Sequence, residues 1–188
     1  MRVALQHKDL TIEVFDDSSF TETSDSPTSY EKVYRAGNGY TSVSQHAIII
    51  YRDSVKTTSA ILLADAGATS VTSDAVLIDG DNLITRCCNT VFCLSIPELN
   101  LIWMAEADWA TCFSIHKYQD SYITHGEISV ARIDRKGNLL WSYSGTDIFV
   151  CLDRGTPFKM HNSHIELTDF SGGKYEIDYN GETISYKQ

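Results

Sequence analysis

The sequence predicts an all-β fold of antiparallel strands, and a repeated segment is the first observation behind that prediction. Residues Asp81–Asp108 and Asp120–Asp147 align at one constant offset until one residue is lost in a turn. The matched pairs are Thr85/Thr124, Val91/Val130, Leu94/Ile133 and Trp103/Trp141. Short apolar runs also recur about every 8 to 12 residues between Asp, Asn and Gly, as in an antiparallel meander. We therefore expect about 12 to 15 strands of typical length.

The composition is that of a folded, acidic protein. Hydrophobic residues make up 43% of the 188 residues, enough for a sizeable core. The formal charge of −10 argues against a broad basic face for nucleic acid or anionic membranes, which need clustered Lys and Arg. Such a charge can instead steer the protein toward a basic partner. We therefore expect a protein partner, but neither nucleic-acid nor membrane binding; the oligomeric state stays open.

Two further features concern the cellular compartment. The N-terminal residues have no apolar signal region, and no run approaches the length of a membrane span. Five cysteines are an odd number, and most lie inside apolar runs, as expected of buried free thiols in a reducing compartment. These features predict a cytoplasmic protein.

One domain is expected to span residues 1–188, with irregular N-terminal strands in residues 1–70 and repeats in residues 71–188. Between the first two strands, Asp16–Ser29 contains four acidic residues and no basic one, which predicts a mobile loop. The predicted N-terminal strands are Leu10–Val14, Tyr30–Arg35, His46–Tyr51 and Ser59–Leu63.

The repeat half continues the strand pattern to the C-terminus. A looser third copy of the repeat runs from Ser163 to Gly181. One conflict lies at Pro97 to about Ala110, where a capping-box pattern and helical spacing allow a helix. We favour a strand there because Trp103 aligns with Trp141, whose flanks read as strand. The predicted strands are Val76–Ile78, Leu83–Arg86, Asn89–Leu94 and Leu99–Ala105, their counterparts in the second copy, and Ile148–Leu152, Lys159–Leu167 and Lys174–Tyr179.

The segment ITHGEISVARIDRKGNLLWSYSGTDIFV resembles one blade of the quinoprotein-type (PQQ-like) β-propeller repeats. In that family a strand ending in a hydrophobic-Asp pair leads to a turn such as Arg135–Asn138, and the next strand ends in Trp, as at Trp141. The resemblance covers about half the chain, from Val76 to Trp141. It implies an antiparallel meander of propeller-like repeats, as a small or incomplete β-propeller or a β-sandwich. Closed propellers need at least four blades, and here two clear units and one faint one are visible.

No motif for catalysis or metal binding stands out. Cys112 or Cys151 could pair with His116, His125 or His161, but no known nucleophile sequence surrounds either cysteine. Likewise, neither His161 with His164, nor the Cys87, Cys88 and Cys93 group, nor Asp79–Asn82 has the spacing of a zinc or calcium site. We therefore predict no catalytic residue, no metal and no cofactor.

The leading functional hypothesis is a non-enzymatic acidic binding protein. Its concrete form is a cytoplasmic inhibitor or immunity-type protein that blocks a basic partner, such as a nuclease toxin. The rivals are a hydrolase or lyase acting on a sugar and a sugar-binding module without catalysis. Trp109 lies outside the repeat alignment and is expected to be exposed. His125 either lines a groove at a repeat junction or is a core histidine, with Gly126 making room. The candidate binding residues are Asp16, Asp17, Glu22, Asp25, Trp109, His125 and Glu127.

Overall fold

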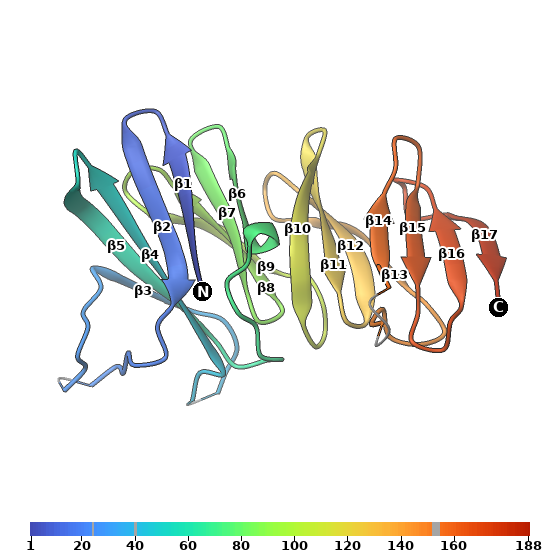
Figure 1. Ribbon diagram of the computed structural model, residues 1–188, viewed down its shortest axis with the longest axis horizontal. Helices are drawn as coiled ribbons and strands as arrows, with labels where there is room; N and C mark the ends of the chain where they lie inside the picture. Colours follow the sequence, from blue (N-terminus) through green and yellow to red (C-terminus); the bar gives the residue numbers. More distant parts are fainter. Residues whose placement is uncertain (24, 40, 152–154) are drawn as a thin grey trace.

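The computed structural model describes residues 1–23, 25–39, 41–151 and 155–188, and within them the fold is all-β. It contains seventeen strands and one short 3-10 turn, Ser73–Ala75, in four sheets that stand side by side in an open row (Figure 1). The all-β, propeller-like prediction is therefore confirmed, with more strands than expected. Among the described residues, no helix has the length and apolar character needed to cross a bilayer.

The first sheet is mixed, and the other three are antiparallel meanders. The first has the order β1-β2-β4-β5-β3, and β3 lies parallel to β5. Its strands are β1 (Arg2–His7), β2 (Leu10–Asp16), β3 (Lys32–Arg35), β4 (Ser44–Arg52) and β5 (Val55–Ala64). The second sheet has β6 (Val76–Asp79), β7 (Asn82–Cys87), β8 (Thr90–Ser95) and β9 (Leu101–Glu106). The third has β10 (Cys112–Tyr118), β11 (Ser121–Gly126), β12 (Ser129–Asp134) and β13 (Leu139–Ser144). The fourth has β14 (Phe158–Met160), β15 (Ile165–Thr168), β16 (Lys174–Ile177) and β17 (Thr183–Lys187).

The sequence repeat corresponds to whole strands of the second and third sheets. β7, β8 and β9 match β11, β12 and β13, and each outer strand has a register shift at the same place. β9 is a strand, so the helical alternative is wrong. The looser third copy matches β15 and β16 of the fourth sheet, whose outer strand β17 has the same register shift.

The core lies between the sheets, because each sheet packs its face on its neighbour. All six residues of β11 are buried, as are five of the six in β7, so these strands contact a neighbour on both faces. Separate apolar clusters fill the three junctions, with Leu62 and Phe92 in the first, Ile84 and Tyr122 in the second, and Ile123 and Ile165 in the third. Face-to-face packing of this kind buries apolar area on sheets that could not fold alone.

An aromatic side chain links the outer strand of each sheet to the next sheet. Trp103 of β9 donates from Nε1 to the carbonyl of Arg135, 2.8 Å away, and Trp141 of β13 donates to the carbonyl of Tyr179, 3.0 Å away. In the first sheet Tyr34 takes this position, and its hydroxyl donates 2.9 Å to the carbonyl of Leu99. The three junctions therefore share one geometry.

Both ends of the row are closed by polar groups or by a loop. On the free face of the first sheet, Phe20 and Tyr30 of the acidic loop pack on Ile61 and Leu63. In the fourth sheet, Phe158, Ile165 and Ile177 face the third sheet. The residues that alternate with them point to the outer face of the fourth sheet, where Lys159 lies opposite Glu166. This outer face therefore carries charged side chains at paired positions.

Three parts of the predicted strand pattern are wrong. Ile148–Leu152 was expected to be a strand, but described residues 148–151 turn tightly, and Leu152 lies outside the described residues. The reason is that Phe149 turns into the core, where it is fully buried. Lys159–Leu167 is two strands, joined by a turn that His161 closes with a 2.8 Å bond to the carbonyl of His164. β1 and β17 were not predicted at all.

Candidate functional site

A groove lies at the outer rim of the junction between the second and third sheets. It has a volume of about 240 Å³ and is open to solvent. We call it the Trp109 groove. Its lining residues are Glu106, Ala107, Asp108, Trp109, Ile128, Ser129, Leu139, Ser142 and Ser144.

The two repeats differ in size at one position next to Glu106, a lining residue of the groove. Ala105 on β9 pairs with Val91, and Tyr143 on β13 pairs with the equivalent Val130. At the next junction the ring of Tyr143 packs edge-on against Tyr175 and fills the rim. Between the second and third sheets the equivalent position carries only the methyl group of Ala105.

Asp108 holds the two loops that form the floor of the groove. One carboxylate oxygen accepts hydrogen bonds from the backbone N–H groups of Ala110 and Thr111, at 2.7 and 3.0 Å. The other accepts from the N–H groups of Ile128 and Ser129, at 3.0 and 2.8 Å, and from the Ser129 hydroxyl. Both oxygens are occupied and the residue is buried, so Asp108 is a structural anchor.

Trp109 is 82% exposed, which confirms the prediction drawn from its position outside the repeat alignment. Glu106 is exposed on the same side of the groove, and within the described residues it has no ion-pair partner. Neither Lys nor Arg lines this part of the described surface. Glu127 lies close by, since its N–H donates 2.8 Å to the carbonyl of Thr111. The structure thus places the backbone of Glu127 beside the loop that carries Trp109, although Glu127 does not line the groove.

The hypothesis that His125 lines a groove is wrong. The residue is 7% exposed, stacks on Phe158 at 5.0 Å between ring centres, and has Nε2 3.1 Å from the carbonyl of Phe149. Burial lowers the pKa of His125 to about 4, so it is neutral at pH 7 and Nε2–H donates to that carbonyl. A Cβ on Gly126 would come 2.2 Å from Oδ2 of Asp108, so Gly126 permits this packing.

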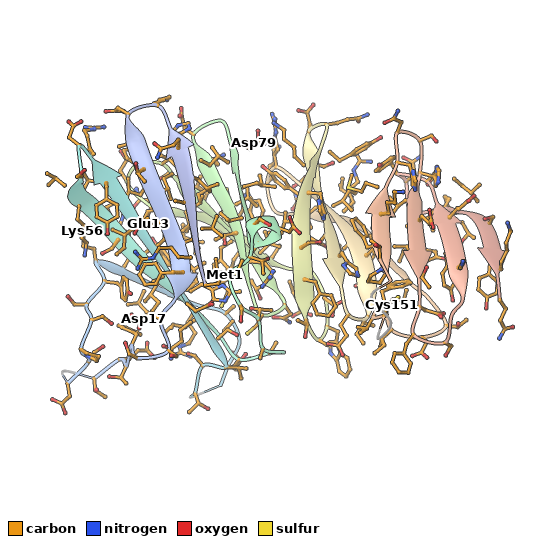
Figure 2. The ribbon with its side chains drawn as sticks, in the orientation of Figure 1. Met1, Glu13, Asp17, Lys56, Asp79 and Cys151 are labelled. Atoms are coloured by element: carbon orange, nitrogen blue, oxygen red, sulfur yellow. The ribbon has the colours of Figure 1, made fainter. Side chains whose placement is uncertain are left out.

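The acidic loop is not a set of free carboxylates. Asp17 is 7% exposed and accepts hydrogen bonds from Ser19, Thr28 and Tyr30, so its carboxylate is engaged within the chain instead of presented to solvent (Figure 2). Burial by itself raises the pKa of Asp17, but these hydrogen bonds outweigh it and hold the pKa below 3.8.

The other three acidic candidates also lie at the first sheet. Asp16 accepts from the N–H of Val71 at 2.9 Å and pairs with the N-terminal amine, and Glu22 pairs with Arg35. Asp25 is exposed in the same loop. The second sheet separates this group from the Trp109 groove. The loop covers the first sheet because its carboxylates are used to fasten it.

Among the described residues, neither Cys112 nor His116 nor the buried His46 has the partners of a catalytic pair or triad. Cys112 is fully buried, and burial raises the pKa of its thiol to about 12, which keeps it protonated. Ser114 lies 2.8 Å from Nε2 of His116, but no carboxylate hydrogen-bonds that ring among the described residues. His46 has Asp16 and Thr69 both at Nε2, so it cannot relay a proton between them as a triad histidine does. No group of three His, Cys, Asp or Glu in the described residues could hold a metal ion.

Of the nine lining residues, sequence reasoning named only Trp109 and missed the other eight, among them Glu106, Ser142 and Ser144. A signal was present in the repeat, where Ala105 stands against Tyr143. When equivalent positions of two repeats carry a small and a large side chain, the two repeats cannot pack in the same way at that position.

The comparisons with known proteins concern the fold. No protein-family model matches the chain, and no curated protein matches it. Among solved structures it is similar to BamB from Moraxella catarrhalis, with 15% identity and a TM-score of 0.50 over 75% of this chain and 42% of that one. It is also similar to the computationally designed Ika8 protein, with 8% identity and a TM-score of 0.53 over 98% of this chain and 48% of that one. The chain thus spans less than half the length of either, and identities this low show a shared propeller-like fold alone.

Proposed function

We propose that this protein is a non-enzymatic binding protein that recognises a basic partner at the Trp109 groove. The observation that carries the proposal is an exposed indole in the same groove as Glu106, which forms no ion pair with the described residues, and neither Lys nor Arg lines that groove. Aromatic side chains dominate binding energy at protein interfaces, and a Lys or Arg over an indole face gains a cation–π attraction. The formal charge of −10 favours a basic partner over long range.

Inhibition of a basic toxin in the cytoplasm is the concrete form of this proposal. All five cysteines are free, and four of them are buried, as expected of a protein kept in a reducing compartment. The contact surface differs from the one expected from sequence, because the acidic loop is fastened to the first sheet. Association should therefore depend on Glu106 and Trp109, and not on Asp16 or Asp17.

The test is site-specific cross-linking in the full chain. Trp109 is replaced by the photo-reactive p-benzoylphenylalanine, and the same replacement at Phe170, 49% exposed in the turn between β15 and β16, is the control. Irradiation in lysate of the producing cell should capture a basic protein at position 109 alone. With that partner purified, Trp109→Ala should raise the Kd about tenfold or more. Equal capture at both positions, or a captured partner whose affinity ignores Trp109→Ala and salt, would contradict the proposal.

A sugar-binding module is the second candidate, because the hydroxyls of Ser142 and Ser144 face the groove that Trp109 borders. A glycan array would separate the two proposals, since a sugar binder should retain specific glycans and a protein binder should retain none. The hydrolase alternative has less support. Glycoside hydrolysis uses two carboxyl groups about 5 to 9.5 Å apart, and both oxygens of Asp108 already accept hydrogen bonds.

A further inference from the structure

The edge strand β13 differs from every other edge strand of the four described sheets. Each sheet has two edge strands, and seven of these eight carry at least one charged residue. β13, with the sequence LLWSYS, carries neither a charge nor a proline. Proteins normally protect exposed edges with charges, prolines or bulges, because unpaired backbone groups are a template for another strand. The register shift beside β13 recurs at β9 and β17, so it does not set β13 apart.

The edge of β13 is also free and apolar. In the described part of the chain, its backbone makes hydrogen bonds only to β12. Leu139 and Leu140 are 54% and 51% exposed at its start, whereas native edges of this kind are usually covered. Six residues at about 3.3 Å each give a free edge of roughly 20 Å, which suits a partner segment of similar length.

The charge beside this edge defines what can bind there. Ser142 and Ser144 of β13 line the Trp109 groove, so a strand added to β13 would place alternate side chains toward Glu106 and Trp109. A volume of about 240 Å³ is below that of typical small-molecule sites. A long basic side chain fits it, pairing with Glu106 and lying over the indole of Trp109.

We propose that β13 accepts an extended basic segment of the partner as a fifth strand of the third sheet, with an Arg or Lys of that segment in the Trp109 groove. This inference rests on the proposed function and adds the mode of binding. Main-chain hydrogen bonds supply affinity in such strand addition, and the alternate side chains supply specificity.

The test uses a fluorescein-labelled hexapeptide of alternating arginine and valine as the probe, with the full chain. A second peptide is methylated on alternate backbone nitrogens, which keeps its charges but removes the donors that strand addition needs. Methylation should raise the Kd at least about tenfold, since each lost backbone hydrogen bond costs about 1 kcal/mol. Amide NMR signals of Leu139–Ser144 should shift with the unmethylated peptide, and their hydrogen exchange should slow.

Two protein variants locate the side-chain contact. Glu106→Gln should raise the Kd of the unmethylated peptide about two- to fivefold at low salt. Glu182→Gln removes an exposed carboxylate beside β17 and is the matched control, with no change expected.

Three results would overturn strand addition. Equal binding of both peptides, with Glu106→Gln weakening both, would show a site that binds basic peptides without strand addition. The proposed function would then survive. Absence of saturable binding by either peptide would also overturn it, while the cross-linking experiment decides the proposed function separately. The third is sedimentation showing a dimer whose β13 amides are already protected, because a second copy of this chain would then occupy the edge.

Discussion

The indole ring of Trp103 lies directly against Gly137 of the next sheet. A Cβ at position 137 would come 2.8 Å from Cδ2 of that ring, closer than real Cβ atoms approach. Trp141 repeats the relationship on Gly181, again with 2.8 Å to Cδ2. Both glycines have a φ of +85°, which other residues rarely adopt. The second and third sheets are thus each fastened to the next sheet by one indole and one glycine turn.

Gly137→Ala should therefore destabilise the protein by more than the free-energy cost of placing an alanine at a positive φ. We expect the free energy of unfolding to fall by about 2–4 kcal/mol, from a backbone cost of about 1–2 kcal/mol plus displacement of the Trp103 ring. Gly172→Ala is the matched control, because φ is +88° there and nothing lies within 4 Å of the added Cβ. Urea denaturation of both variants measures the difference. Equal losses would mean that the ring contact contributes nothing.

Asp79 should control stability on the acid side. Its carboxylate is 7% exposed and contacts Lys117 at 2.5 Å, Tyr122 at 2.9 Å and Arg135 at 3.2 Å, from the third sheet (Figure 2). Burial alone raises the pKa of Asp79, but the hydrogen bonds from Lys117 and Tyr122 and the charge of Arg135 outweigh it, so its pKa lies below 3.8.

A lowered carboxyl pKa contributes stability that is complete above the unfolded-state value and is lost as the pH falls through the folded-state value. Asp79→Asn should thus lower the free energy of unfolding at pH 7 by about 1–3 kcal/mol, because the buried position loses its charged hydrogen bonds to the half-exposed Lys117 and Arg135. Its stability should also vary less with pH below about pH 4. Denaturant titrations from neutral to acid pH measure both effects. If the variant loses stability below about pH 4 as steeply as the wild type, Asp79 is not the group that causes this loss.

His125 should make stability depend on pH in a different window. Its pKa falls from 6.5 to about 4 on folding, so the unfolded chain binds the proton more tightly. The stabilisation that the neutral ring of His125 contributes to folding is complete above about pH 6.5. It is lost as the pH falls toward 4, and the whole loss is about 3 kcal/mol.

His125→Phe keeps the stacked ring on Phe158 and removes the titration. The variant should lose most of the slope between pH 4 and 6.5 in denaturant titrations, while His125→Ala should lose several kcal/mol at every pH. Neither change should alter the affinity for the partner. A His125 variant that is as stable as the wild type but binds the partner more weakly would show that His125 takes part in binding.

Ala105→Tyr should close the Trp109 groove by copying the packing of Tyr143. We expect the partner Kd to rise more than about tenfold, because the inserted ring occupies the space that the partner needs. Stability should change by less than about 1.5 kcal/mol, since the ring fills an existing gap. Tyr143→Ala is the reciprocal variant, and calorimetry of both compares the two junctions. Unchanged affinity in Ala105→Tyr would place the partner elsewhere.

Several features followed from residues close together in the chain. The alternation of apolar and polar residues and the Asp/Asn/Gly turns are local signals, and the Trp103/Trp141 match separated strand from helix. Exposure of Trp109 followed from its place outside the repeat. The strands missed were β1 and β17, at the two ends of the row, where one face is polar and apolar periodicity is weak.

The site depended on contacts between distant residues, which no local pattern contains. Acidic residues in a row predicted a free loop, yet Asp17 is buried because Tyr30 and Thr28 fold back onto it. His125 is buried because Phe158, from the next sheet, stacks on its ring. The sequence alone determined that the chain is a row of repeated β-sheets with one exposed tryptophan. Only the tertiary structure decided which rim stays open, because that depends on how Ala105 and Tyr143 fill the space between packed sheets.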